Sequence, residues 1–230
     1  MERMTPFTVG EYYHVYNRGI DKRKIFFSKG DWKHFQRLMY IRNTDSSAKL
    51  NLSRIKDEPL KLVFQGDPGT LVDVVAYAMM DNHFHLLVRE KVKGGVTKFM
   101  SRFMTSYSMY MNKKYDRTGP LMCRPFKTKH IDSDEYFRWL ISYIHLNPID
   151  QIQSDWEDVG VVDKRSTLKF LKEYKYSSYP DYFVDERDES MILNKEALPI
   201  NIEDLEDLTE MLDEVGQYEH SNVPGDPWNI

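Results

Sequence analysis

The sequence predicts an α+β fold in which an antiparallel sheet packs against helices. Two kinds of segment lead to this expectation. Alternating or continuous apolar residues typical of strands occur at 11–18 and 71–88, and apolar residues at helical spacing occur at 29–42 and 96–115. The order of strand, helix, strands, helix and strand is compatible with a ferredoxin-like arrangement. A chain of 230 residues, 41% of them hydrophobic, has ample material for a core.

The first strand is expected from Glu11 to Arg18, where apolar and polar residues alternate. A Gly-Ile-Asp turn follows, and then an amphipathic helix from Lys29 to Arg42. Ser28 supplies the start signal of this helix. Its buried face should carry Trp32, Phe35, Leu38 and Met39.

The middle of the chain predicts a hairpin and a long helix. Residues 44–58 are polar and are expected to form a loop. Strands are expected at 60–65 and 71–80, joined by the turn residues Gly66-Asp67-Pro68-Gly69, and the histidine-bearing strand should end near Val88. A long helix should run from Val96 to Tyr115, with aromatic and Met residues along one stripe.

Residues 121–131 are expected to be a strand or an extended basic loop. A helix should follow at 134–147, because apolar residues at 137, 140, 141 and 144 repeat at helical spacing and Pro148 marks a stop. Beyond it, 151–162 should be a loop, 166–174 a short helix, and 177–183 an extended Tyr-rich segment.

The charge is divided unevenly along the chain. The net charge is −4, but residues 181–230 hold 15 acidic residues against Arg187 and Lys195. Residues 89–130, by contrast, hold 11 Lys or Arg against Glu90 and Asp116. A basic region followed by an acidic tail is a charge distribution typical of proteins that bind polyanions.

The acidic tail, residues 184–230, is expected to be partly disordered or to form a short helix within 201–216. Two interpretations stay open. In the first, the tail screens the basic surface at low salt. In the second, it docks through a leucine stripe at Leu205, Leu208 and Leu212.

A cytoplasmic protein is expected. No run approaches the roughly 20 apolar residues of a membrane span, and residues 1–6 lack the apolar core of a secretory signal. Cys123 stands alone, so an intrachain disulfide is impossible and a reducing compartment is favoured.

Two histidines interrupt the apolar run at 74–88, as His83-Phe84-His85. Side chains alternate along a strand, so both imidazoles should project from one face and Phe84 from the other. Such a pair can form half of a metal site. The alternative is a hydrogen-bonded pair of structural histidines.

Tyr143 and Asn147 lie four residues apart on the predicted helix and should share a face. Together they would present a nucleophile and an amide oxygen able to complete a metal shell. Imidazole and oxygen ligands suit Mn²⁺ or Mg²⁺, although ligand type alone leaves Zn²⁺ open. A divalent ion helps because the phenol pKa of about 10 leaves about one tyrosine in a thousand ionised at pH 7.

The sequence resembles the REP-associated tyrosine transposases, which are relatives of the insertion-sequence 200-like transposases. The resemblance covers roughly residues 8–183. It rests on the His-hydrophobe-His (HUH) motif at 83–85 and the Tyr-Ile-x-x-Asn-Pro block at 143–148, and on the blocks at 13–19, 115–121 and 175–179. The chain departs from the family at 123–127, where the family more often has a Gly-Arg-Phe-Lys type segment.

This resemblance implies an HUH nuclease domain at 1–183, with the HUH strand central and the tyrosine helix packed across it. It implies that Tyr143 attacks single-stranded DNA beside a hairpin and forms a 5′-phosphotyrosine link, with His83, His85 and Asn147 binding Mg²⁺ or Mn²⁺. Resemblance to the REP-associated branch implies a monomer that acts in cis, whereas the insertion-sequence relatives act as dimers. Expected DNA-binding residues are Arg18, Arg102, Lys113, Lys114, Arg117, Arg124, Lys127 and Lys129.

Two other functions stay open. One is a domesticated hairpin-binding protein that does not cleave, which the intact motif residues argue against. The other is a ferredoxin-like RNA endonuclease that uses a metal-free general base and the RNA 2′-hydroxyl.

Overall fold

The computed structural model describes residues 6–44, 58–63, 69–200, 210–212 and 215. Most of the expected loop at 44–58, of the turn at 66–69 and of the acidic helix at 201–216 lies outside the described residues. Within the described part, no helix has the length and apolar character needed to cross a membrane.

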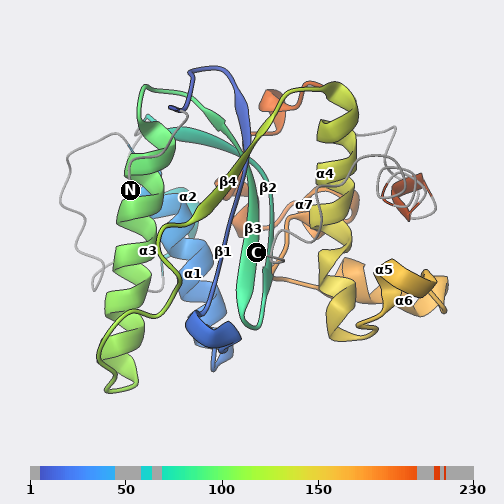
Figure 1. Ribbon diagram of the computed structural model, residues 1–230, viewed down its shortest axis with the longest axis horizontal. Coiled ribbons are helices and arrows are strands. Elements are labelled where there is room, and N and C mark those ends of the chain that lie inside the picture. Colours follow the sequence, from blue (N-terminus) through green and yellow to red (C-terminus); the bar gives the residue numbers. More distant parts are fainter. Residues whose placement is uncertain (1–5, 45–57, 64–68, 201–209, 213–214, 216–230) are drawn as a thin grey trace.

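Four strands form one antiparallel sheet in the order β2-β3-β1-β4 (Figure 1). The strands are β1 (Tyr12–Arg18), β2 (Val72–Met80), β3 (His83–Glu90) and β4 (Lys127–Ile131). Two turn residues, 81 and 82, split the apolar run into the hairpin β2–β3. With α1 between β1 and β2 and α3 between β3 and β4, this is the ferredoxin-like order, and the predicted α+β class is confirmed.

Helices cover both faces of the sheet (Figure 1). On one face, α1 (Lys29–Arg42) and α3 (Gly95–Lys114) enclose an aromatic core that includes Phe84 of β3. On the other face, α4 (Asp134–Leu146) packs on Leu87 of the same strand. Because neighbouring residues of a strand point to opposite faces, a sheet buried on both sides needs apolar residues at consecutive positions. This is why 74–88 is almost continuously apolar.

Helix α1 begins where the sequence predicts. Asp31 accepts hydrogen bonds from the backbone N–H groups of Phe27 (2.9 Å) and Ser28 (2.8 Å) at the helix start. Its carboxylate also accepts from Lys114 (2.6 Å) and Tyr115 (2.7 Å). The fully buried carboxylate of Asp31 therefore joins the start of α1 to the end of α3.

The Asp31 contacts predict an acid-sensitive component of stability. Burial opposes ionisation, but the hydrogen bonds from Lys114, Tyr115 and the backbone outweigh it and lower the pKa of Asp31 from 3.8 to about 2. The ionised form is thus stabilised by folding, so this contribution is present above about pH 4 and is lost as the pH falls toward 2. After allowance for solvent screening it is on the order of 1–2 kcal/mol.

Urea unfolding of the wild type and of Asp31→Asn measures this contribution. The wild type should be more stable than the variant at pH 5, and the difference should shrink toward pH 2.5. A difference that stays constant across this range would contradict the assignment, because the other carboxylates titrate equally in both proteins.

Two predicted elements are wrong. Residues 60–63 form a helix, α2 (Leu60–Val63), instead of a strand, since Leu60 and Val63 are buried at a spacing of three. Residues 179–183 form α7 (Tyr179–Phe183) instead of an extended segment. Its aromatic residues at 179, 182 and 183 have helical spacing, and Pro180 lies in the first turn, where it is tolerated.

The remaining helices follow α4. The predicted loop at 151–162 contains the short α5 (Trp156–Val159), and the predicted short helix is α6 (Lys164–Glu173). Short 3-10 segments occur at Ile20–Lys22, Asn147–Gln151, Asp188–Ile192 and Lys195–Ala197.

The edge strand β2 is covered by the segment from Tyr174 to Asn194. Backbone hydrogen bonds join Met79 N–H to Tyr176 O (3.0 Å), Ser178 N–H to Tyr77 O (2.9 Å) and Asn194 N–H to Val74 O (2.8 Å). A covered edge cannot pair with another chain, so this segment protects the sheet from edge-to-edge association.

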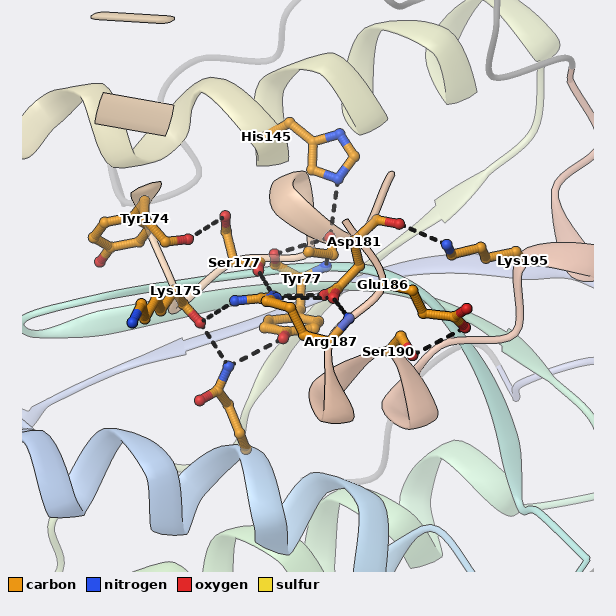
Figure 2. A network of polar contacts seen from close by, with 12 residues as sticks. Tyr77, His145, Tyr174, Lys175, Ser177, Asp181, Glu186, Arg187, Ser190 and Lys195 are labelled. Atoms are coloured by element: carbon orange, nitrogen blue, oxygen red, sulfur yellow. Dashed lines mark hydrogen bonds and ion pairs between the residues drawn. The ribbon is translucent and has the colours of Figure 1, made fainter. Parts of the chain in front are cut away.

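A buried ion pair holds the covering segment together (Figure 2). The guanidinium of Arg187 donates to the Asp181 carboxylate, with Nε 2.8 Å from Oδ1, and to the carbonyls of Lys175 and Ser177. Lys195 in turn donates to the Asp181 carbonyl (2.5 Å). The described start of the acidic tail, 184–200, is thus bound to the sheet domain by specific contacts.

Candidate active site

Strand β3 places His83 and His85 on the face of the sheet that α4 covers. Their ring centroids lie 5.1 Å apart with the planes at 85°. His85 is fully buried, whereas His83 is half-buried. Phe84 between them points to the other face and packs against Phe35 at 5.1 Å. The alternation expected from the sequence is therefore present.

Helix α4 brings Tyr143 to this histidine pair. The Tyr143 ring meets the His85 ring edge-on, with centroids 5.6 Å apart and planes at 89°. The Tyr143 ring also stacks on Trp139 at 5.0 Å. Only 7% of Tyr143 is exposed. Two motifs about 60 residues apart in the sequence thus meet between the sheet and one helix.

Asn147 caps the end of α4, one turn after Tyr143. Its backbone N–H donates to the Tyr143 carbonyl, and its backbone stays helical as the chain enters the 3-10 segment Asn147–Gln151. Pro148 therefore begins a 3-10 turn instead of ending all helical structure. Within the described residues, no hydrogen-bond donor reaches the buried Oδ1 of Asn147. A buried amide oxygen of this kind is suited to bind a cation.

Two imidazoles and one amide oxygen are donor types that suit Mn²⁺ or Mg²⁺. Nδ1 of His83 lies 2.6 Å from Oδ1 of Asn82, so an ion held by His83 would be bound through Nε2. In the described part of the chain, no three His, Cys, Asp or Glu side chains are grouped to hold a metal ion. Any ion at this site would therefore depend on the Asn147 oxygen as its third protein ligand.

Two residues of β1 belong to the site, and the sequence reasoning missed their role. Nε2 of His14 lies 2.8 Å from Nδ1 of His85, and the two rings stack at 5.0 Å. Tyr16 stacks on His85 at 5.8 Å. Alternation places His14 and Tyr16 on one face of β1, but only the pairing of β1 with β3 places them beside His85.

Burial keeps the inner histidines neutral. Desolvation, with a smaller effect of the Lys129 charge, lowers the pKa of His14 to about 3. Desolvation, followed by the charges of His14 and His83, lowers the pKa of His85 well below its usual value. Neutral imidazole is the form that binds metal ions.

Four of the eight predicted DNA-binding residues lie near the histidines. In the sheet register, Arg18 pairs with His83, Lys127 with Tyr16, and Lys129 with His14. Arg124 lies in the loop next to the end of β1, since the neighbouring Cys123 N–H donates to the Arg18 carbonyl (2.9 Å). The basic β4 edge thus adjoins the site.

The other four predicted residues do not share this surface. Arg102, Lys113 and Lys114 lie on α3, in the layer on the opposite face of the sheet, and Arg117 follows that helix. Lys114 pairs with the buried Asp31 carboxylate at 2.6 Å, and Arg102 donates to the Thr44 carbonyl at 3.0 Å. Lys114 therefore has a structural role.

Tyr107, Tyr110, Tyr115 and Tyr136 are alternative nucleophiles by residue type alone, but each of them, like His145, makes other contacts. The hydroxyl of Tyr107 donates to the Ile25 carbonyl, and those of Tyr110 and Tyr115 donate to Asp31. Tyr136 packs beneath the Lys129 ammonium, 4.1 Å from the ring centroid. Nε2 of His145 lies 2.9 Å from the Ser178 hydroxyl, which agrees with a structural role.

Residues 54–147 match the family described as "Transposase IS200 like". The matched region contains β2, β3, α3, β4 and α4, and therefore both histidines, Tyr143 and Asn147. This part of the chain is therefore similar to an IS200-like transposase domain. Strand β1, with His14, precedes the matched residues. No curated protein matches the chain.

Two solved structures resemble the transposase domain and its surroundings. One is a REP-associated tyrosine transposase bound to a REP hairpin, with 12% identity, coverage of 78% of this chain and 83% of that chain, and a TM-score of 0.44. The other is the tRNA(His) guanylyltransferase of Saccharomyces cerevisiae, with 12% identity, coverage of 88% and 84%, and a TM-score of 0.37.

Proposed function

We propose that this transposase cleaves single-stranded DNA beside a hairpin and transfers the cleaved strand, with Tyr143 as the nucleophile. The observation that carries the proposal is the contact of the Tyr143 ring with His85 at 5.6 Å. It joins a nucleophile to a pair of ligands suited to a divalent ion. The competing tyrosines at 107, 110 and 115 lie in the layer on the opposite face.

In the proposed reaction, the deprotonated Tyr143 oxygen attacks the scissile phosphorus. A bond from the tyrosine oxygen to phosphorus forms as the bond from phosphorus to the 3′-oxygen breaks. The 3′-oxygen takes up a proton and leaves as a hydroxyl, and the 5′-phosphate stays on Tyr143. Attack by a 3′-hydroxyl of another strand reverses the step, so no nucleotide cofactor is needed.

His83, His85 and Asn147 would hold Mg²⁺ or Mn²⁺ in this site. The ion would supply positive charge to the scissile phosphate and favour ionisation of the phenol. Trp139 fixes the plane of the Tyr143 ring by stacking at 5.0 Å. Arg18, in register with His83, would add positive charge at the half-buried end of the site.

DNA binding would use the basic edge beside the histidines. Arg18, Arg124, Lys127 and Lys129 would contact phosphates, and Phe126 between them could stack on an unpaired base. The pairing of His85 and Tyr143 within one chain supports catalysis in cis by a monomer. We further propose a catalytic domain at 1–183, an appended acidic tail at 184–230, and action in the cytoplasm.

Cleavage of labelled oligonucleotides tests the proposal. Hairpins with single-stranded flanks are made as DNA and as RNA, and each is incubated with Mn²⁺, with Mg²⁺ or with a chelator. Cleavage of DNA that requires metal supports the proposal. RNA cleavage in the chelator indicates a ribonuclease, and binding without cleavage of any substrate indicates a non-cleaving hairpin-binding protein.

His83→Ala should lower metal-dependent cleavage about 100-fold or more, because the ion loses an imidazole ligand. His130→Ala is the matched control, since His130 is an exposed histidine of β4 that contacts Glu11. Equal cleavage rates in the two variants would remove His83 from the site.

A further inference from the structure

His14, a buried histidine of β1, lies beside the His85 ring. Its Nε2 lies 2.8 Å from Nδ1 of His85, a hydrogen-bond distance, and both side chains are almost fully buried. The two residues are diagonal neighbours on adjacent strands, since His14 pairs with Leu87 and Tyr16 pairs with His85 in the antiparallel register. The β1–β3 pairing thus fixes this contact.

The contact decides which nitrogen of His85 can bind an ion. Nδ1 of His85 is occupied by His14, so only Nε2 is left for a metal. A neutral imidazole carries one proton, and the nitrogen that binds a metal must be the unprotonated one. With Nε2 as the ligand atom, the proton of His85 is on Nδ1 and is donated to Nε2 of His14.

We propose that His14 is a positioning residue for the metal site: it accepts the Nδ1–H hydrogen bond of His85 and thereby keeps Nε2 of His85 unprotonated for the ion. This inference rests on the proposed function, because it assumes that His85 is a metal ligand. It adds a residue of β1, which lies outside the part of the chain that matches the transposase family.

The surroundings of His14 suit it to this role. Its ring stacks on Tyr16 at 4.7 Å and on His85 at 5.0 Å, so the orientation of the imidazole is fixed. The His14 side chain is almost fully buried, and burial disfavours a positive charge on an imidazole. A neutral imidazole in a fixed orientation is a dependable acceptor.

Binding of Mn²⁺ to the DNA-free protein tests the assignment without any cleavage reaction. His14→Phe keeps a ring for stacking and removes the acceptor, whereas His14→Gln keeps an acceptor at similar reach. Electron paramagnetic resonance titration should show Mn²⁺ affinity about 10–100-fold weaker for His14→Phe. His14→Gln should stay within about threefold of the wild type, since its side-chain oxygen can still accept the Nδ1–H hydrogen bond of His85.

His145→Phe controls for general loosening of a buried core. It removes another buried histidine with a hydrogen bond, the one to Ser178, and should leave Mn²⁺ affinity unchanged. Wild-type affinity in His14→Phe, or equal weakening in His14→Phe and His14→Gln, overturns the role of His14 alone. Absence of Mn²⁺ binding by the wild type overturns the metal site itself and this inference with it.

Nitrogen NMR of the wild-type protein gives an independent test that needs no variant. Long-range ¹H–¹⁵N spectra of the imidazole rings distinguish protonated from unprotonated nitrogens. We expect His85 to carry its proton on Nδ1. A proton on Nε2 of His85 in the presence of Mg²⁺ would contradict the proposal, even if His14→Phe fails to fold.

Discussion

Tyr143→Phe is expected to abolish the covalent protein–DNA adduct while leaving hairpin binding within about twofold of the wild type. The substitution removes only the hydroxyl, and the ring keeps its contacts with His85 and Trp139. Loss of a nucleophile typically lowers the rate by on the order of 10⁴-fold or more. Denaturing gels measure the adduct, and fluorescence anisotropy measures DNA binding.

Tyr16→Phe is the matched control for this experiment. Tyr16 is a second tyrosine beside His85, with ring centroids 5.8 Å apart. It should still form the adduct, because the proposed nucleophile is retained. An adduct that persists in Tyr143→Phe and disappears in Tyr16→Phe would move the nucleophile from α4 to β1.

Asp181→Asn is expected to destabilise the protein by about 3 kcal/mol. The Asp181 side chain is fully buried and the Arg187 side chain is only 19% exposed, so the substitution leaves a largely buried guanidinium without its counter-charge. Arg187 also holds the Lys175 and Ser177 carbonyls, which belong to the segment that covers β2 (Figure 2). Urea unfolding measures the loss.

Asp21→Asn tests whether burial is the cause. Asp21 and Arg23 form an ion pair of similar length, 2.7 Å, but their side chains are 78% and 46% exposed. Water and salt screen such a pair, so the variant should unfold at the wild-type urea concentration. Equal destabilisation by the two substitutions would show that burial of the Asp181–Arg187 pair is not decisive.

The main residues of the candidate site could be predicted because their positions follow the side-chain periodicity of a single strand or a single helix. Strand alternation places His83 and His85 on one face, and helical spacing places Asn147 one turn after Tyr143. The contact between the β3 histidines and Tyr143 of α4 could not be predicted from either periodicity. It depends on α4 packing on the face that carries Leu87, which is a property of the tertiary structure.

His14 could not be assigned from the sequence because its role depends on register. A shift of one residue in the β1–β3 pairing would turn every side chain of β1 to the other face. The contact of Lys114 with Asp31 could not be derived from the sequence either. It lies in the basic region of the sequence, but its ammonium is bound to Asp31, which is 83 positions away.

The misread elements of the fold lie outside the central strands and helices. The apolar run at 60–63 and the Tyr-rich run at 177–183 are too short for periodicity to separate strand from helix. Tertiary contacts determine whether each of these runs forms a strand or a helix. The place beside β2 that a further strand could occupy is taken by 174–194, the segment held by Arg187 and Asp181.

The identity of the nucleophile in the wild-type protein tests the central claim most directly. The protein is trapped on a hairpin oligonucleotide whose short 3′-hydroxyl product diffuses away, then digested with nuclease and trypsin and analysed by tandem mass spectrometry. The tryptic peptide 139–164 contains Tyr143 as its only tyrosine. We predict a 5′-linked nucleotide on this peptide. A nucleotide linked to the peptide that carries Tyr16, or DNA cleavage without any linked peptide, would contradict the account.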